Sequence, residues 1–342
     1  MKETHILINL QLLRFIAAFM IVLTHIILFG NRKYGLDLPS LFDAELILRI
    51  GVDIFFVISG FIMTFTTKYK PVSIKDFLYN RFTRVYPVYW IICLALLPIL
   101  ILKPEWINAS SSVPPSFWHS FFLFPTEGAP LLMVAWTLEF EMFFYIIFAL
   151  TMFMGHRKQI TAITILFFLS FTLGEHLNPS DNTQALLTLT TSSMLLEFVA
   201  GMWLAHAYER IKKSRVLVAS LFMFAIVTTL AILVLENMPR GFIYGIPAFF
   251  WVATFLFAEK INWRAHKAIS LFGGNISYAL YLVHIPVIIS IAKTWQMYNL
   301  EQVIPVEAML LFATLASIKT ATILFYVIEK PSLKWLRNYN KP

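Results

Sequence analysis

Long apolar runs, separated by short polar segments, dominate the pattern along this chain. A membrane-spanning helix needs about 20 mostly apolar residues. On this criterion the sequence predicts ten spans, near 8–29, 47–67, 85–103, 131–154, 159–175, 185–207, 216–235, 241–258, 272–293 and 305–328. The apolar stretch 116–124 is too short to cross a bilayer, and we expect an interfacial or re-entrant segment there. The pattern therefore predicts an all-α, polytopic membrane protein with about ten transmembrane helices.

The composition agrees with a lipid environment. Of the 342 residues, 59% are hydrophobic and 13% are charged, whereas soluble domains carry roughly a quarter charged residues. The single cysteine, Cys93, lies inside an apolar run, which excludes a disulfide framework and a multi-cysteine metal site. We expect no metal centre. Without internal repeats or low-complexity tracts, residues 1–342 are expected to form one transmembrane domain.

The positions of lysine and arginine predict the orientation. If the N-terminus lies inside, most of the 27 Lys and Arg residues fall in inner segments, among them 68–84, 210–215 and 260–267. The positive-inside rule then places both termini in the cytoplasm, and the first apolar run is expected to be a retained signal anchor. This topology accounts for the net charge of +8. No nucleic-acid-binding motif accompanies the charge, so we expect membrane lipids, and no nucleic acid, as partners.

Two ionisable residues, Arg14 and His25, lie within the first predicted span. They are eleven positions apart, about three helical turns, and so project from nearly the same face. At a rise of roughly 1.5 Å per residue they lie about 16 Å apart along the axis, too far for an ion pair. Ionisable residues inside spans mark functional sites by default. The alternative is an Arg14 that snorkels and a His25 that is satisfied by a neighbouring helix.

Two acidic residues open the fourth predicted span. Glu139 and Glu141 point to different faces of a helix, so at most one is expected to share a cavity with His25. A buried carboxylate can orient a histidine and stabilise its protonated ring. The alternative is that both side chains lie in water at the outer interface. We favour that alternative for Glu139 and a functional role for Glu141, which lies deeper in the span.

The second predicted span and the segment after it carry further candidates. Asp53 is either functional or a helix-end charge in water, and Ser59 with Gly60 is equally typical of ordinary small-residue packing. The basic loop that follows contains Lys75, Arg81 and Arg84. Such cations bind either anionic lipid headgroups or the phosphates of a cofactor.

The ninth predicted span has a polar stripe formed by Ser277, Tyr281 and His284 at i, i+4 and i+7. A stripe of this kind faces protein rather than lipid. The safer interpretation of His284 is a hydrogen-bonded core histidine. Glu197 and Lys319 are further charged residues within predicted spans, and the sequence assigns no role to either.

These motifs together resemble the membrane acyltransferase-3 family, and they run in the family's order from the first helix to the C-terminus. The segment around Arg81 departs from many members because it lacks two adjacent arginines. The matching blocks are Leu13-Arg14 through His25, an Arg-x10-His element; Gly51-Val-Asp53 through Ser59-Gly60-Phe61; Arg81-x-x-Arg84-x-Tyr86-Pro87; Trp136-x-Leu138-x-x-Glu141-x-x-Phe144-Tyr145; Ser277-Tyr278-x-x-Tyr281-x-x-His284-x-Pro286; and Glu329-Lys-Pro331.

The resemblance implies a bacterial enzyme of the cytoplasmic (inner) membrane, most similar to the stand-alone exopolysaccharide or surface-glycan O-acetyltransferases. It implies acetyl-CoA as donor and a carbohydrate hydroxyl, free or in a lipid-linked precursor, as acceptor. We assign His25 as general base, Glu141 as the residue that orients it, and Arg14 to the donor or the developing charge. Donor phosphates are assigned to Lys75, Arg81 and Arg84, with Arg14 further inside, and the acceptor to Asp53, Ser59, Tyr281 and His284.

A protein of another class, a transporter or flippase of a lipid-linked glycan, would also use intramembrane Arg, His and Glu residues. The sequence shows neither an inverted repeat nor a pair of broken helices, which are typical of such transporters. We therefore favour the enzyme.

Overall fold

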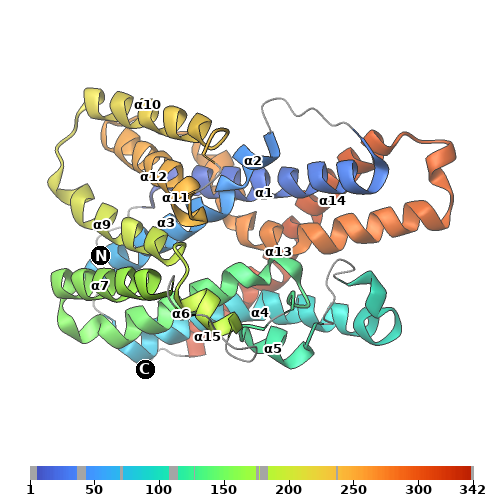
Figure 1. Cartoon of the computed structure of the whole chain (residues 1–342), viewed down its shortest axis with the longest axis horizontal. Coiled ribbons are helices and arrows are strands. Elements are labelled where there is room, and N and C mark those ends of the chain that lie inside the picture. Colours follow the sequence, from blue (N-terminus) through green and yellow to red (C-terminus); the bar gives the residue numbers. More distant parts are fainter. Residues whose placement is uncertain are drawn as a thin grey trace. The chain divides into compact units, whose positions relative to one another are not determined.

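The computed structural model describes residues 6–36, 44–69, 72–107, 115–126, 128–174, 177, 184–235 and 238–339. Within these ranges the chain forms helices joined by turns and short connections, and it contains no strand (Figure 1). The all-α prediction is confirmed. The chain divides into two compact units, 1–69 with 196–278 (unit 1) and 70–195 with 279–342 (unit 2).

Unit 1 is built on the first two long helices and on three helices from the middle of the chain. α10 packs along α12, and both α1 and α12 pack against α3 (Figure 1). The unit comprises α1 (Ile8–Tyr34), α2 (Ala44–Leu48), α3 (Ile50–Tyr69), α9 (Leu195–Arg210, from its second residue), α10 (Arg215–Ala231), α11 (Arg240–Ile243), α12 (Gly245–Lys260) and the part of α13 (Lys267–Met297) up to Tyr278.

Close approach of helix backbones holds unit 1 together. A Cβ atom on Gly60 of α3 would overlap the carbonyl of Phe198 on α9, and one on Gly201 of α9 would overlap the carbonyl of Val57. Only glycine fits at two such reciprocal contacts, and small residues serve this purpose where membrane helices pack. The small-residue interpretation of the Ser59-Gly60 pair is therefore confirmed for Gly60.

The longest helix of unit 2 is α4, which has 29 residues. α4 packs against α6 and against the C-terminal helix α15. The unit comprises α4 (Ile74–Leu102), η1 (Pro104–Trp106), α5 (Phe117–Phe122), η2 (Met133–Ala135), α6 (Trp136–Thr151), η3 (Met152–Met154), α7 (His156–Gly174), α8 (Gln184–Thr190), α13 from Ala279, η5 (Leu300–Gln302), α14 (Val306–Leu324), a π-helical turn η6 (Phe325–Glu329) and α15 (Lys330–Tyr339).

Every predicted span overlaps helix within the described residues, and eight of the helical segments are long and apolar enough to cross a membrane by length and composition. The predicted spans 159–175 and 216–235 correspond to α7 and α10. α7 has 19 residues but opens on His156, Arg157 and Lys158, and α10 has only 17. The described part of 116–124 contains the six-residue helix α5. The cytoplasmic placement of the termini stays a prediction; the termini themselves, with Lys2 and Lys341, lie outside the described residues.

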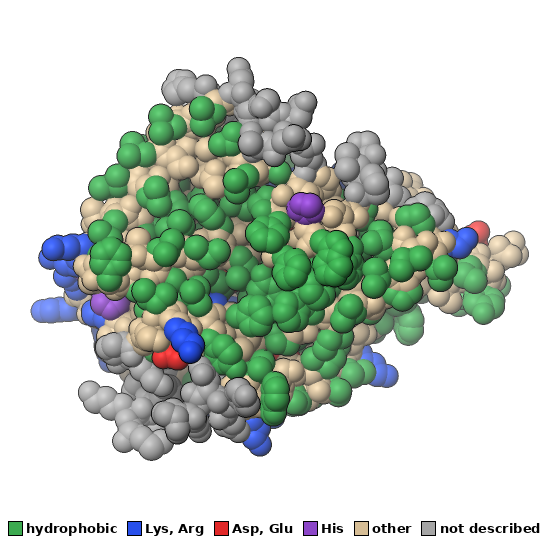
Figure 2. All heavy atoms as spheres, turned by 90° about the horizontal axis from the view of Figure 1, so that it is seen from below, with side chains coloured by type: hydrophobic (Ala, Val, Ile, Leu, Met, Phe, Trp, Pro, Cys, Tyr) green, Lys and Arg blue, Asp and Glu red, His purple; other side chains and the backbone are tan. Residues whose placement is uncertain are grey.

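The described surface is strongly apolar. Figure 2 shows hydrophobic side chains across much of one face of the molecule, with few charged side chains among them. Large apolar residues are exposed in runs, for example Leu311, Phe312 and Leu315 on α14 and Phe222 to Phe224 on α10. Apolar patches of this extent are uncommon on water-soluble monomers and suit contact with lipid chains. With the eight candidate spans, this surface describes a multi-pass membrane protein.

Candidate active site

His25 lies on α1, half-buried, and its ring is oriented by its own helix. The Nδ1 atom lies 2.9 Å from the carbonyl oxygen of Ile21, one turn earlier. Because a carbonyl oxygen can only accept, Nδ1 carries the hydrogen and donates it, and the neutral ring then has its lone pair on Nε2. The helix thereby selects the tautomer in which Nε2 is the basic nitrogen.

The helices α1 and α3 pack closely at a point on α1 that lies between Arg14 and His25. A Cβ atom on Gly51 of α3 would overlap the backbone carbonyl of Ala17, and Ala17 and Ala18 are both fully buried. Arg14 lies one turn before this contact, half-buried, with its Nη1 atom donating to the Gln11 side chain at 3.2 Å. The small residues let the helices meet while Arg14 and His25 stay on the less buried part of α1.

A charged pair that the sequence reasoning missed lies near His25. Glu45 on α2 forms an ion pair with Arg49, four positions later, and the charges of both act on the His25 ring. The i, i+4 spacing of opposite charges is a recognisable signal in the sequence. Its proximity to His25 depends on the packing of α2 against α1, which the spacing does not predict.

Asp53 is not a helix-end charge in water, and that alternative is wrong. Its side chain is fully buried in α3, and Oδ2 accepts a hydrogen bond of 3.1 Å from Nη2 of Arg240. The carboxyl group of Glu197, which is 2% exposed, interacts with that of Asp53. Glu197, to which the sequence assigned no role, thus belongs to a buried Asp53–Glu197–Arg240 cluster. Substrate binding by Asp53 and by the half-buried Ser59 stays a prediction.

In unit 2, the structure connects two of the predicted site residues through an aromatic ring. The Tyr145 hydroxyl donates a hydrogen bond to Glu141 one turn earlier on α6. The guanidinium carbon of Arg81 lies 5.8 Å from the centroid of the same ring and 5.8 Å from that of Phe77. The Arg81 Nε atom is buried and has no hydrogen-bond partner among the described groups. Arg81, Tyr145 and Glu141 therefore form one contiguous group.

The basic segment that contains Lys75, Arg81 and Arg84 is helix rather than loop, which corrects the prediction. α4 begins at Ile74 because Ser73 caps it: the Ser73 hydroxyl accepts a 3.0 Å hydrogen bond from the Asp76 amide. Lys75 is exposed in the first turn. Serine at this position is a strong helix-start signal, and it extends the helix about three turns ahead of the predicted apolar span.

Arg84 forms an ion pair with Glu329, a residue that is 1% exposed. Glu329 ends the π-helical turn η6, and such wide turns occur frequently at functional sites. The ion pair joins two of the motifs that carry the family resemblance, the arginine block and Glu-Lys-Pro. Binding of the donor phosphates by Lys75, Arg81 and Arg84 stays a prediction. The ion pair with Glu329 already gives Arg84 a partner within the protein.

Glu139 is half-buried and not a fully wet interface charge. It lines a cavity of about 480 Å³ in unit 2 together with the Trp136 ring and the polar side chains of Thr126, Gln184 and Thr188. Glu141 does not line this cavity in the described structure but accepts the hydrogen bond from Tyr145. The prediction that the two acids face different surroundings is confirmed.

Tyr281 and His284 stabilise the core of unit 2. The Tyr281 hydroxyl donates to the carbonyl of Val134 at 2.8 Å and shares a 2.6 Å hydrogen bond with Thr137. His284 is fully buried, and its Nδ1 atom donates to the Leu280 carbonyl at 3.1 Å. The interpretation of His284 as a hydrogen-bonded core histidine is confirmed, and an acceptor contact by either residue stays a prediction.

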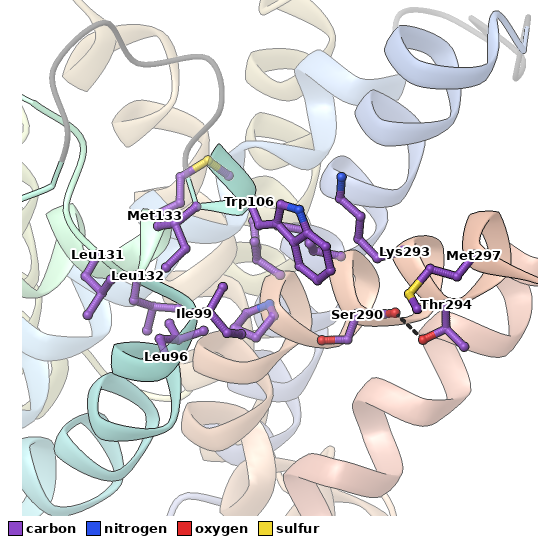
Figure 3. Close-up of a pocket in the computed structure, with 14 residues that line it drawn as sticks. Leu96, Ile99, Trp106, Leu131, Leu132, Met133, Ser290, Lys293, Thr294 and Met297 are labelled. Carbon is purple, nitrogen blue, oxygen red and sulfur yellow. Dashed lines mark hydrogen bonds between the residues drawn. The ribbon is translucent and has the colours of Figure 1, made fainter. Parts of the chain in front are cut away.

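A second cavity of unit 2, of about 200 Å³, lies between α4, η1, η2 and α13 (Figure 3). Its lining is mainly apolar, with Leu96 and Ile99 on one side. The ammonium group of Lys293 lies 5.1 Å from the centroid of the Trp106 ring, and Thr294 donates to the Ser290 carbonyl at the same end. One cation beside an apolar lining suits an amphiphilic group better than a phosphate-rich one.

The predicted catalytic residues are therefore divided between the two units. Arg14 and His25 lie in unit 1, whereas Glu141 and the Arg81 group lie in unit 2. Within unit 1 the arrangement provides an imidazole with a defined basic nitrogen. Within unit 2 it provides a carboxylate whose position is held by a tyrosine hydroxyl.

Comparison with known proteins gives a consistent result. The family described as "Acyltransferase domain" (Acyl_transf_3) matches residues 7–328. The chain is 29% identical over 299 residues to the exopolysaccharide production protein ExoZ of Rhizobium meliloti, covering 83% of this chain and 89% of ExoZ. It is 27% identical over 325 residues to the O-acetyltransferase OatA of Staphylococcus aureus, covering 83% of this chain and 52% of OatA, so it spans about half the length of that relative. No solved structure matches the chain.

Proposed function

The chain belongs to the acyltransferase-3 family, and from this premise we propose that it is a membrane O-acetyltransferase acting on a carbohydrate. The donor is acetyl-CoA, and the acceptor is a hydroxyl group of a surface polysaccharide or of its lipid-linked precursor. The names of two relatives support the proposal, one an exopolysaccharide production protein and the other an O-acetyltransferase. We assign the enzyme to a bacterial cytoplasmic membrane, as the family resemblance implies, and the predicted orientation has the donor arrive from the cytoplasm.

The observation that carries the mechanism is the hydrogen bond from His25 Nδ1 to the Ile21 carbonyl. With Nδ1 donating, Nε2 accepts the proton of the acceptor hydroxyl as its oxygen attacks the thioester carbonyl. The carbon–sulfur bond then breaks, the thiolate takes up the proton, and the products are the acetyl ester and coenzyme A. A thioester is already activated, so the reaction needs no covalent acyl-enzyme.

Two further residues have proposed roles around this proton transfer. Arg14, half-buried on the same helix, holds the donor or stabilises the negative charge that develops on the thioester carbonyl oxygen. Glu141, held by the Tyr145 hydroxyl, keeps the role assigned to it from the sequence, the stabilisation of the protonated His25 ring. The first role concerns charge on the substrate and the second concerns charge on the base.

Replacement of His25 tests the mechanism. We expect His25→Ala and His25→Gln to lower acetyl transfer at least about 10²-fold, because general-base catalysis typically contributes this much or more. The measurement is transfer of labelled acetyl from acetyl-CoA to a surface-glycan acceptor in membranes with equal amounts of each variant. His266→Ala is the matched control, since His266 is exposed between α12 and α13. Undiminished transfer by His25→Ala would remove the mechanism.

A double-mutant cycle tests whether Glu141 acts through His25. We compare His25→Gln, Glu141→Gln and the double variant in the same transfer assay. Residues that act together show coupling energies of about 0.5–3 kcal/mol, so we expect the double variant to lose less activity than the two single losses predict. Strictly additive losses would assign Glu141 to a different step.

A further inference from the structure

Unit 1 contains a cavity of about 880 Å³ that the proposed mechanism does not use. Its volume falls within the range of roughly 300–1,000 Å³ that is typical of small-molecule sites. It is lined by the start of α1, the end of α9 and the two connections that precede α10 and α13. Among the residues that the structure describes, four cationic side chains and one carboxylate line it, namely Lys213, Lys260, Arg264, Lys267 and Glu259.

The carboxylate is already engaged by the protein itself. One Glu259 oxygen accepts a hydrogen bond from the Ile8 amide and the other from the Asn9 amide, both at 3.0 Å. At the start of α1 these amides have no acceptor within the helix itself, and a negative charge there is stabilising. Arg264 lies 3.8 Å from Glu259, beyond hydrogen-bond distance, and its side chain is 60% exposed. Glu259 therefore offsets about one of the four positive charges around the cavity, chiefly that of Arg264.

Internal hydrogen bonds hold both connections in place. The fully buried Asn9 side chain accepts from the Ala265 amide at 2.8 Å and donates to the Trp263 carbonyl at 2.8 Å, so it positions the connection that carries Arg264. The Lys260 ammonium group donates to the carbonyls of Tyr208 and Ile211, which positions the end of α9 just before Lys213. Side chains on positioned backbone are suited to bind a ligand with little ordering cost.

The cations at this cavity repel one another. Lys260 interacts favourably with the charge of Glu209, which forms an ion pair with Lys68, and, more weakly, unfavourably with the charge of Lys213. Lys213 and Lys267 are exposed and form neither an ion pair nor a hydrogen bond with any described residue. Lys260 differs from them because its ammonium group is occupied by two carbonyls. A ligand with several negative charges would relieve this repulsion, whereas a neutral ligand would not.

We propose that this cavity is a phosphate-binding site, and that its ligand is the nucleotide end of a coenzyme A thioester. Lys213, Arg264 and Lys267, in place of Lys75, Arg81 and Arg84, bind the phosphate groups, and Arg264 suits a bidentate contact. The apolar side of the cavity, with Phe65 and Tyr208 6.0 Å apart, covers the adenine. The sequence places all three cations in inner segments, on the side from which the donor comes. The choice of coenzyme A rests on the proposed function; the phosphate chemistry does not.

The test measures binding of coenzyme A to the purified full-length protein in nanodiscs of neutral phosphatidylcholine. Lys213→Gln, Arg264→Gln and Lys267→Gln are each expected to weaken binding about tenfold, and the triple variant about 100-fold or more, because each removes a charge-assisted contact. Pantetheine, which lacks the nucleotide, serves as the matched ligand, and its binding should not change. Arg32→Gln, at the opposite end of α1, and Lys158→Gln, on α7, are matched exposed controls.

A second arm separates the two sources of phosphate. The same variants are placed in nanodiscs that contain phosphatidylglycerol, and retained lipid is counted by native mass spectrometry. Loss of retained lipid with unchanged coenzyme A affinity would overturn the coenzyme A assignment and assign the site to a lipid headgroup. No change in either arm, with variants that fold as the wild type does, would overturn the site altogether.

Failure of this inference can be told from failure of the proposed function. If the wild type transfers acetyl groups and the triple variant binds coenzyme A normally, only the phosphate site is wrong. If coenzyme A binds in a manner that depends on Lys213 and Lys267 but no acetyl group reaches any acceptor, the site stands and the transferase proposal fails.

Discussion

The two cationic groups of this chain, one on α4 in unit 2 and one around the cavity in unit 1, resemble each other in sequence and differ in structure. On α4, Arg84 forms an ion pair with the buried Glu329, and Arg81 lies against two aromatic rings. At the cavity, Lys213 and Lys267 are exposed and have no ion pair with a described residue. The first group uses its charge inside the protein, and the second presents it.

The comparison shows that a cluster of basic residues in a sequence predicts positive charge. It does not predict whether the charge is free to bind a ligand or is already paired inside the protein. A carboxylate with little access to water is costly unless it is paired, so a nearby arginine is drawn into an internal role. At the cavity, the described carboxylate Glu259 is bound by two backbone amides and lies 3.8 Å from Arg264, so Lys213 and Lys267 remain available to a ligand. The distinction predicts different consequences when the members of each group are replaced.

The largest expected effect is at Arg84. Arg84→Gln leaves the Glu329 carboxylate buried and without its partner, which we expect to lower the free energy of unfolding by about 3–5 kcal/mol. Denaturant titration of the protein in detergent micelles measures this loss. The double variant Arg84→Gln/Glu329→Gln should recover most of it, because no charge is then left unpaired. A single variant as stable as the wild type would show that Arg84 is available for a ligand after all.

An intermediate effect is expected at Tyr145. Tyr145→Phe keeps the ring against Arg81 but removes the hydrogen bond to Glu141, and hydrogen bonds to charged groups contribute about 1.5–3 kcal/mol. We therefore expect a loss of unfolding free energy in this range, together with reduced acetyl transfer if Glu141 acts on His25. Tyr326→Phe, on an exposed tyrosine of η6, is the control. Equal stability of both variants would mean that the Tyr145–Glu141 hydrogen bond is not formed.

The smallest effect on stability is expected at the cavity. Lys213→Gln and Lys267→Gln should change the free energy of unfolding by no more than about 0.5 kcal/mol, which is usual for surface substitutions. Relief of mutual repulsion favours a slight gain. Measured beside Arg84→Gln, they complete the contrast between charge used inside the protein and charge presented to a ligand. A loss of several kcal/mol would reveal an internal partner and remove the basis of the phosphate site.

Much of the architecture followed from the sequence because it depends on local pattern. Apolar runs of spanning length predicted the helices, and residue spacing on one helix predicted that Arg14 and His25 share a stripe of α1. The start of α4 was predicted too late, since the apolar run begins after the helix does. There the local signal was the Ser73 cap and not hydropathy.

The pairings could not be predicted from one sequence, because they join residues far apart in the chain. Arg84 and Glu329 are separated by 245 positions, Asp53 and Arg240 by 187, and Asn9 and Ala265 by 256. Neither hydropathy nor helical spacing carries information on such pairs. The sequence marked Glu197 as costly and unexplained; its neighbour Asp53 became known only when α3 and α9 were seen to pack.

The sequence by itself determined the solvent of this protein, its helical class and the family to which its motifs point, because these depend on the kinds and spacing of residues along single helices. The tertiary structure alone decided which arginines are committed to internal carboxylates and which cations remain at a cavity. These properties depend on groups that lie far apart in the chain and meet only when it folds. A buried carboxylate is costly unless it is paired, so the fold determines which cations it engages.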